Sequence, residues 1–353
     1  KGKRAAEWRL VDEVRPHTKL EAAIAERARA FAVKSERPQS ATGVALTPLD
    51  RTIGPDTRRY KYLAVDYARA DKTATLVMRG PDAPPPASAE DMAAQGASFW
   101  PLQLARELDD AILDLRFNEL DTAAIIFKSE GDRAGVLAYD AFLEAHQDHW
   151  LAREIRHKWK RLLKRIDLTS RTLVALVEPG SCFVGTLAEI VFAADRSYML
   201  VGSMEGDNRP PPALALGPAN FGAYPMSNGI TRLESRFLGE PDSVGKARDR
   251  IGDDLDADEA AELGLVTFAL DDIDWEDEIR VFLEERASFS PDALTGMEAN
   301  LRFGGPETME SKIFARLTAW QNWVFQRPNA IGDEGALRLY GTGRKPAFDT
   351  RRV

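Results

Sequence analysis

The sequence predicts an α/β protein whose central sheet is mainly parallel. Three apolar runs are typical of buried strands, at Thr122–Phe127, Thr172–Val177 and Ser197–Val201. Segments with helical spacing of apolar residues lie between them, over about 138–166 and Leu187–Ala194. Strands that alternate with helices predict βαβ units with right-handed crossovers.

Earlier elements complete the expected sheet and its first crossover. Residues 63–78 predict a β-hairpin, because apolar and polar residues alternate on both sides of a turn at 70–72. Four prolines between 81 and 87 interrupt regular structure. Residues 101–117 then show helical spacing, and Pro101 suits a first helical position, where a missing N–H has no helical partner to lose.

Composition excludes several classes of function. The 353 residues include 47 Lys and Arg against 56 Asp and Glu, a net charge of −9. An acidic chain has no bulk electrostatic attraction to nucleic acid or to anionic membranes. No apolar run approaches the ~18 residues of a membrane span. The single cysteine, Cys182, excludes an internal disulfide and favours a cytoplasmic location.

An internal repeat predicts that the chain carries the end of an earlier domain. Residues 5–11 (AAEWRLV) are similar to residues 260–266 (AAELGLV), 255 positions later, and an acidic amphipathic helix pattern follows each, at Leu20–Phe31 and Trp275–Arg286. A repeat at this distance indicates two domain copies, with coincidence between common helical motifs as the alternative. The chain starts at Lys1 rather than Met, and the first copy lacks the long segment that precedes the motif in the second copy. We therefore expect roughly 190 further residues upstream.

Five motifs, taken in order, resemble those of the crotonase (enoyl-CoA hydratase/isomerase) superfamily. They are the strand and turn Arg171–Gly180, the Gly-to-Asp helix segment Gly185–Asp195, Phe221–Pro225 (LGxxP in the family), Gly229–Leu233 (GxxRL) and Ala260–Val266 (AxxxGLV). The resemblance covers about residues 60–350. It implies the ββα-spiral fold of the ClpP/crotonase type, followed by a helical region, and a CoA thioester as substrate.

Further segments resemble the C-terminal part of one enlarged family in that superfamily, the benzoyl-CoA-dihydrodiol lyases. These segments are Arg106–Ile112, Glu178–Phe183, Asp272–Trp275, Glu298–Phe303 and Leu317–Trp323. The family has two crotonase-like halves. The resemblance implies a lyase of aerobic benzoate degradation that opens the oxygenated, non-aromatic ring of a benzoyl-CoA derivative. It implies a semialdehyde CoA ester and formate as products, and no metal or redox cofactor.

The resemblance and the repeat together predict four segments. Residues 1–36 would be the C-terminal remnant of a first crotonase-like module, and residues 37–59, rich in Pro, Thr, Arg and Gly, a linker. Residues 60–275 would form a second module and residues 276–353 a helical, aromatic region. In this interpretation the working pocket lies in the absent N-terminal half. The half contained in this chain would serve packing and the assembly of a homo-oligomer, for which a dimer is favoured.

Crotonase chemistry needs carboxylates that move protons and backbone N–H groups that hold the thioester oxygen. Glu189 falls at the family's first catalytic Glu, six residues before Asp195, among apolar neighbours that would raise its pKa. The alternative is a structural Glu held by a backbone donor or an Arg. The second family Glu falls on Pro218, which cannot transfer a proton. Glu205 and Asp207, on an inserted loop, are expected to be solvated, with a reach back into a pocket as the alternative.

The residues that supply the two N–H groups also depart from the family pattern. One donor belongs to a glycine three residues before the Glu, where this chain has Thr186 beside Gly185. The other lies near Ala138 and Tyr139, where the family has small residues. The departures favour a half that has lost its chemistry. The alternatives are a stand-alone enoyl-CoA hydratase/isomerase-like enzyme that uses Glu189, and a non-catalytic dimerisation module.

The remaining candidates give weaker hypotheses. His146 and His149 share a face of the long predicted helix, but no Cys or paired Asp completes a metal site. Cys182 is interpreted as a small buried thiol, because a nucleophile needs a base and a lowered pKa. Trp320 and Trp323 are interpreted as core or dimer contacts. Four basic residues of the tail are expected to be solvated, with a contact to the CoA phosphates as the alternative: Arg344, Lys345, Arg351 and Arg352.

Overall fold

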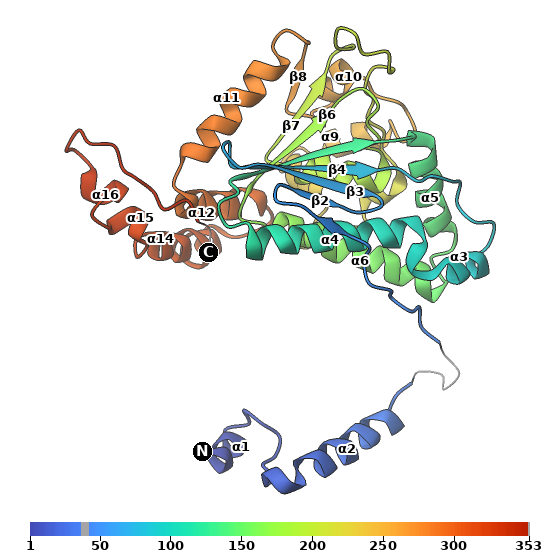
Figure 1. Cartoon of the computed structure of the whole chain (residues 1–353), viewed down its shortest axis with the longest axis vertical. Helices are drawn as coiled ribbons and strands as arrows, with labels where there is room; N and C mark the ends of the chain where they lie inside the picture. The colour runs from blue at the N-terminus through green and yellow to red at the C-terminus, as the bar shows by residue number, and fades with distance from the viewer. Residues whose placement is uncertain (37–41, 352–353) are drawn as a thin grey trace. The chain divides into compact units, whose positions relative to one another are not determined.

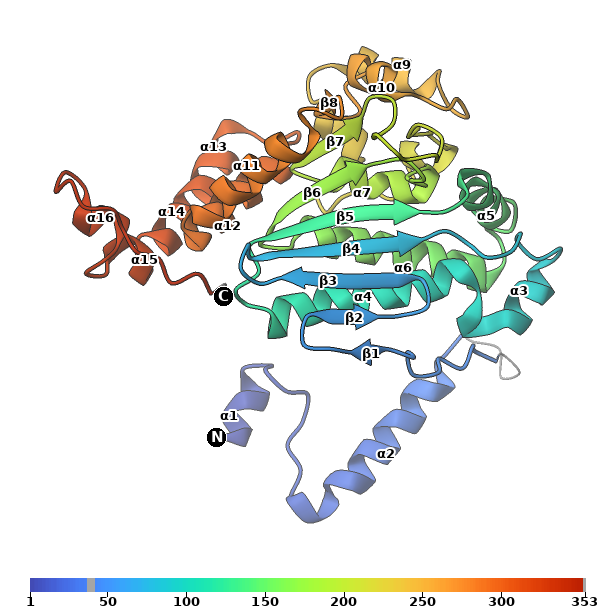
Figure 2. The ribbon, with the colours of Figure 1, turned by 45° about the horizontal axis from the view of Figure 1, so that its top comes forward.

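The computed structural model describes residues 1–36 and 42–351 and separates two units, Lys1–Ala45 and Leu46–Val353. Among these residues the larger unit contains one eight-stranded sheet in the order β1 to β8. Figure 2 shows this order, antiparallel from β1 to β4 and parallel from β4 to β8. The strands are β1 (Thr52–Ile53), β2 (Thr57–Arg59), β3 (Leu63–Ala68), β4 (Thr73–Arg79), β5 (Ala124–Glu130), β6 (Thr172–Val177), β7 (Arg196–Leu200) and β8 (Phe268–Leu270).

Helices connect the parallel strands, which confirms the predicted α/β class. The crossovers contain α3 (Ala89–Gln95), α4 (Trp100–Asn118), α5 (Arg133–Ala145), α6 (Trp150–Asp167), α7 (Ala188–Ala193), α8 (Arg232–Arg236), α9 (Pro241–Arg248) and α10 (Ala257–Glu262). After β8 the described chain is helical: α11 (Trp275–Ser288), α12 (Pro291–Arg302), α13 (Met309–Ser311), the π-helical η4 (Lys312–Leu317), α14 (Thr318–Val324), α15 (Pro328–Ile331) and α16 (Ala336–Leu339). Three short 3₁₀ turns are η1 (Gly96–Ser98), η2 (Gly185–Leu187) and η3 (Pro218–Phe221).

Helices cover both faces of the parallel strands (Figure 1). On one face α11 places Trp275, Ile279 and Phe282 against β5, β6 and β7, where Val174 and Leu176 are among the buried contacts. Because side chains alternate along a strand, the intervening residues of β6, Leu173, Ala175 and Val177, face the side of α4 and α6. Each of these fully buried apolar side chains stabilises the fold by roughly 1.5–3 kcal/mol.

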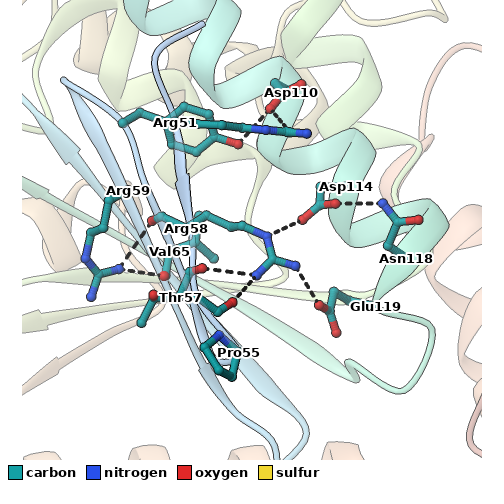
Figure 3. Close-up of polar contacts among 12 residues, drawn as sticks. Arg51, Pro55, Thr57, Arg58, Arg59, Val65, Asp110, Asp114, Asn118 and Glu119 are labelled. Carbon is teal, nitrogen blue, oxygen red and sulfur yellow. Dashed lines mark hydrogen bonds and ion pairs between the residues drawn. The ribbon is translucent and has the colours of Figure 1, made fainter.

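A buried arginine holds the antiparallel edge of the sheet against α4 (Figure 3). On β2, Arg58 donates from Nε to Asp114 Oδ2 at 2.8 Å and from Nη2 to Glu119 Oε1 at 3.0 Å. Its Nη1 donates to the carbonyls of Gly54 and Thr57, both at 3.0 Å. Arg58 is only 7% exposed. Its charge is therefore compensated by Asp114 of α4 and by Glu119 just after that helix rather than by water.

Two predicted boundaries are wrong. The helix predicted over 138–166 is two helices, because His149 caps the start of α6 by accepting the Leu151 N–H on its ring nitrogen. His146 and His149 therefore do not share a helix face. The linker predicted over 37–59 contains β1 and β2, which are too short to give a periodic pattern. Residues 37–41 of that segment lie outside the described residues.

The N-terminal unit contains two helices, at the segments where the sequence predicts a repeat. Its first helix, α1 (Gly2–Glu7), has six residues and ends on Ala-Ala-Glu, as α10 does 255 positions later. Its second helix, α2 (His17–Val33), follows α1 as α11 follows α10. Neither α1 nor α2 buries a residue. The large apolar side chains Leu10 and Phe31 are 70% and 63% exposed. The assignment of this unit to a first module stays a prediction.

Candidate active site

Glu189 lies in the first turn of α7, and its carboxylate belongs to a buried ion-pair network. Oε2 accepts from Arg232 Nη1 at 2.9 Å, and Oε1 accepts from Asn220 Nδ2 at 2.8 Å. Arg232 also donates from Nη2 to Asp167 Oδ2 at 2.7 Å and from Nη1 to the Tyr224 carbonyl at 3.0 Å. Glu189 and Arg232 are 1% and 2% exposed. Desolvation raises the pKa of Glu189, and the charge of Arg232 opposes that rise.

This environment favours the structural interpretation of Glu189. Both carboxylate oxygens already accept hydrogen bonds from the chain, and a general acid or base must instead reach the substrate. Asp167 and Arg232 line a cavity, but Glu189 is not among the residues of its wall. A catalytic role for Glu189 stays a prediction that this geometry does not favour.

The N–H groups predicted to hold a thioester oxygen are bound to the chain itself. The Thr186 N–H donates to Asp140 Oδ2 at 2.6 Å, and the Thr186 hydroxyl donates to Oδ1 at 2.7 Å. The Gly185 N–H donates to the Ala215 carbonyl at 3.0 Å. Tyr139 lies within α5, where its N–H belongs to the helical hydrogen-bond ladder. A thioester oxygen would reach Thr186 only if Asp140 moved away, so the assignment of these donors also stays a prediction.

The Asp140 carboxylate is a part of this site that the sequence did not predict. Desolvation raises the pKa of Asp140 to about 6, although two hydrogen bonds from Thr186 oppose the rise. Tyr224 extends the cluster, with its hydroxyl 3.1 Å from Thr186 Oγ1. Gly185 has a φ of +50°, and a methyl group on its Cα would overlap with Asp140 Oδ2. The sequence signal that could have found Asp140 is an acidic residue among the apolar positions of a predicted helix. A carboxylate in such a place needs hydrogen-bond donors nearby, because burial without them is costly.

Comparison with known proteins bears on the fold and on the resemblance found in the sequence. No family model matches the sequence. The chain is 49% identical, over all 353 residues, to the benzoyl-CoA-dihydrodiol lyase of Aromatoleum evansii, and it spans 63% of that relative's length. Its structure is similar to an enoyl-CoA hydratase of Geobacillus kaustophilus (TM-score 0.58, 18% identity, 83% of this chain and 98% of the other). A Bacillus anthracis enoyl-CoA hydratase is also similar (TM-score 0.54, 17% identity, 82% and 100%).

The chain has the crotonase fold. The fold prediction is therefore confirmed, as is the similarity to benzoyl-CoA-dihydrodiol lyase. Because the solved crotonase structures share less than a fifth of their residues with this chain, they show the fold alone. The roles of individual residues must come from their contacts in this chain.

Several other residues that the sequence analysis considered have partners other than Glu189. Cys182 is buried, and burial raises the pKa of its thiol to about 11, so it is protonated at neutral pH. His146 packs on the Phe142 ring with centroids 4.4 Å apart. Within residues 1–36 and 42–351 no group of three or more His, Cys, Asp or Glu side chains is arranged to hold a metal ion.

The loop and tail residues have surface partners. Asp207 pairs with Arg209, whose guanidinium lowers the pKa of Asp207 to about 2. In the tail, Arg344 pairs with Glu334, and Arg351 pairs with Asp349. Arg352 lies outside the described residues. In the helical region, Trp320 and Trp323 are half-buried and meet edge to face with centroids 5.5 Å apart. Across the described ranges no helix has the length and apolar character that crossing a bilayer requires.

Asp140 gives a testable pH dependence of stability. Its folded pKa of about 6 exceeds the value near 3.9 expected when unfolded, so the folded state binds this proton more tightly. The stabilisation that this proton gives is therefore full below about pH 4. It is lost as the pH rises through about 6, and the free energy of unfolding falls by up to roughly 3 kcal/mol. Asp140→Asn keeps hydrogen-bonding groups for Thr186 but carries no titrating proton, and it should remove this slope. Urea unfolding at pH 4 to 7 measures the effect.

Glu144→Gln is the matched control, because Glu144 is exposed on the same helix. It should leave the slope in place. Equal slopes for the wild type and Asp140→Asn between pH 4 and pH 7 would contradict the prediction.

Proposed function

We propose that this chain is the C-terminal part of a CoA-ester lyase that opens the oxygenated, non-aromatic ring of a benzoyl-CoA derivative. The products would be a semialdehyde CoA ester and formate. The observation that carries the proposal is the 49% identity over the whole chain to benzoyl-CoA-dihydrodiol lyase. CoA would enter as part of the substrate, and we propose no metal or redox cofactor. We also propose a cytoplasmic location, which the single cysteine supports because it leaves no internal disulfide to form.

The working pocket of this enzyme would lie in an N-terminal half outside this chain. Three local features support this placement. The Thr186 N–H is bound to Asp140, and Glu189 is held by Arg232. The family's second Glu falls on Pro218, the first residue of η3. With each required group engaged or replaced, Glu189 would stabilise the fold instead of transferring protons.

Residues 1–36 would complete the sheet of that N-terminal half. In the larger unit, the segment after α10 forms β8, which pairs with β7, and α11 then covers the sheet. The segment between α1 and α2 forms no strand. A strand is stable only beside a partner, and the apolar face of a helix needs a surface to bury it. The exposed apolar side chains of this unit would be buried against the sheet of the first module.

The helical region after α11 would form the contact of a homodimer. Large apolar side chains remain exposed along it, and burial of exposed apolar side chains drives the association of subunits. The most exposed of them are Leu301 (71%), Met309 (71%), Phe314 (72%), Ile331 (54%) and Tyr340 (88%).

Formate release from a ring-oxygenated, non-aromatic benzoyl-CoA derivative tests the proposal. The longer natural polypeptide should release formate, and residues 1–353 alone should release none. Glu189→Gln in the longer polypeptide should retain turnover within twofold while lowering its melting temperature. That combination separates a structural role from a catalytic one.

Two outcomes would overturn the placement of the pocket. Formate release by residues 1–353 alone, reduced at least a hundredfold by Glu189→Gln, would assign catalysis to this chain. Absence of formate release by the longer polypeptide, together with no micromolar binding of CoA esters, would favour a non-catalytic crotonase-like module. Because the N–H groups of Gly185 and Thr186 are already bound, the non-catalytic module is the main alternative to the proposed function.

A further inference from the structure

A cavity of about 320 Å³ lies where the start of β7 and α8 meet the helices α11 and α12. It is separate from the Gly185 and Thr186 donors, neither of which is part of its wall. The wall is rich in guanidinium groups, contributed by five arginines: Arg196, Arg232, Arg236, Arg286 and Arg302. This concentration is notable in a chain whose net charge is −9.

Three of these arginines are neutralised by carboxylates of the chain. The ion pairs are Arg232 with Asp167 and Glu189, Arg286 with Glu298, and Arg302 with Asp195 and Glu298. These three guanidinium groups therefore meet four carboxylates, and they have no charge left for a ligand.

The other two arginines have no such partner. Among the described residues, no ion pair joins Arg236 or Arg196 to a carboxylate. Arg236 donates from Nε to the Gly264 carbonyl, and burial lowers the pKa of its guanidinium. Arg196 lies over the Phe282 ring, with 4.1 Å from its guanidinium carbon to the ring centroid. A partly buried cation without an anion is costly, and an anionic ligand relieves that cost.

We propose that this cavity binds a small organic carboxylate through Arg196 and Arg236. Guanidinium groups match the planar geometry of a carboxylate and form paired hydrogen bonds with it. The apolar part of the wall favours an organic ligand over a hydrated inorganic anion. That part consists of Phe192, Met226, Phe282, Met297 and Leu301. An aromatic or short aliphatic group on the carboxylate would lie against these side chains.

Calorimetric titration of the 353-residue chain with benzoate, benzamide and inorganic phosphate tests this site. Benzamide has the shape of benzoate without its charge, so the pair isolates the contribution of the carboxylate. Benzoate should bind saturably and raise the melting temperature, whereas benzamide and phosphate should do neither at the same concentrations. Arg196→Gln and Arg236→Gln should each weaken benzoate binding at least tenfold. Arg338→Gln, an exposed arginine on α16, should leave it unchanged.

Four results would overturn the proposal: no saturable binding of benzoate, equal binding of benzamide, binding of phosphate alone, or unchanged affinity in both cavity variants. Should loss of the Gly264 hydrogen bond unfold Arg236→Gln, Arg196→Gln still decides the question, because Arg196 contacts the cavity from a different element. The titration involves neither formate release nor a longer polypeptide. A negative titration would leave the proposed function untouched, and a negative formate-release experiment would leave the carboxylate site untouched.

Discussion

Arg232→Met should lower the free energy of unfolding by about 3–5 kcal/mol, one of the largest effects of a single substitution in this chain. Arg232 is the shared cation of Asp167 and Glu189, and all three side chains are nearly inaccessible to water. Without the guanidinium, two carboxylates remain buried with no compensating charge. Methionine fills much of the same space, so the loss reports the charge rather than an empty volume. Urea unfolding followed by circular dichroism measures the change.

The pH dependence of this variant has a definite sign. Loss of Arg232 raises the pKa of Glu189 and Asp167 further above their unfolded values, because desolvation is no longer opposed by a cation. The folded variant then holds protons that the unfolded chain releases. Its stability should therefore fall as the pH rises, and the cost of the substitution should be larger at pH 8 than at pH 5.

Arg250→Met provides a matched control. Arg250 also pairs with two carboxylates, Asp253 and Glu259, but all three lie at the surface. Its loss should cost much less than the loss of Arg232, because exposed ion pairs are screened by water. Replacing the buried acids together with Arg232, as Asp167→Asn and Glu189→Gln, should recover part of the stability. Equal costs for Arg232→Met and Arg250→Met would show that the buried network does not hold this region together.

Gly185→Ala should be comparably severe, with a cost of about 3–5 kcal/mol. Two independent effects add. The backbone of Gly185 is left-handed, with φ +50°, which a side chain disfavours. The new methyl group would also overlap with Asp140 Oδ2, the oxygen that accepts the Thr186 N–H. Relief of the overlap requires that this carboxylate leave its donors. Thermal and urea unfolding of the variant measure the cost.

Gly217→Ala is the control for this prediction. A methyl group there would have no neighbour closer than 3.6 Å, and the backbone is not left-handed. The expected cost is about 1 kcal/mol or less. Asp140→Ala removes the side chain that the new methyl group would meet. Gly185→Ala should therefore lower the free energy of unfolding less in the Asp140→Ala background than in the wild type. If Gly185→Ala were no worse than Gly217→Ala, the tight approach of Asp140 would be disproved.

Several features follow from the sequence by itself. The apolar run of β6 extends over all the residues predicted for it, because a strand buried on both faces needs no polar alternation. The hairpin of β3 and β4 and the helix that starts around Pro101 also form as predicted, since alternation and proline placement are local signals. The repeat at 255 positions is likewise a matter of sequence, and helices of equal length, α1 and α10, occupy it.

Only the tertiary structure decided what the candidate site is. The pattern around Glu189 indicates burial, but burial is equally compatible with a proton-transfer residue and with a structural ion pair. The deciding partner, Arg232, is 43 positions away, and Asp140 is 46 positions from the Thr186 N–H that it occupies. The two cavity arginines without acids, Arg196 and Arg236, are equally invisible in sequence. Periodicity reports which side of an element faces inward, whereas the packing of distant elements determines which charges meet there.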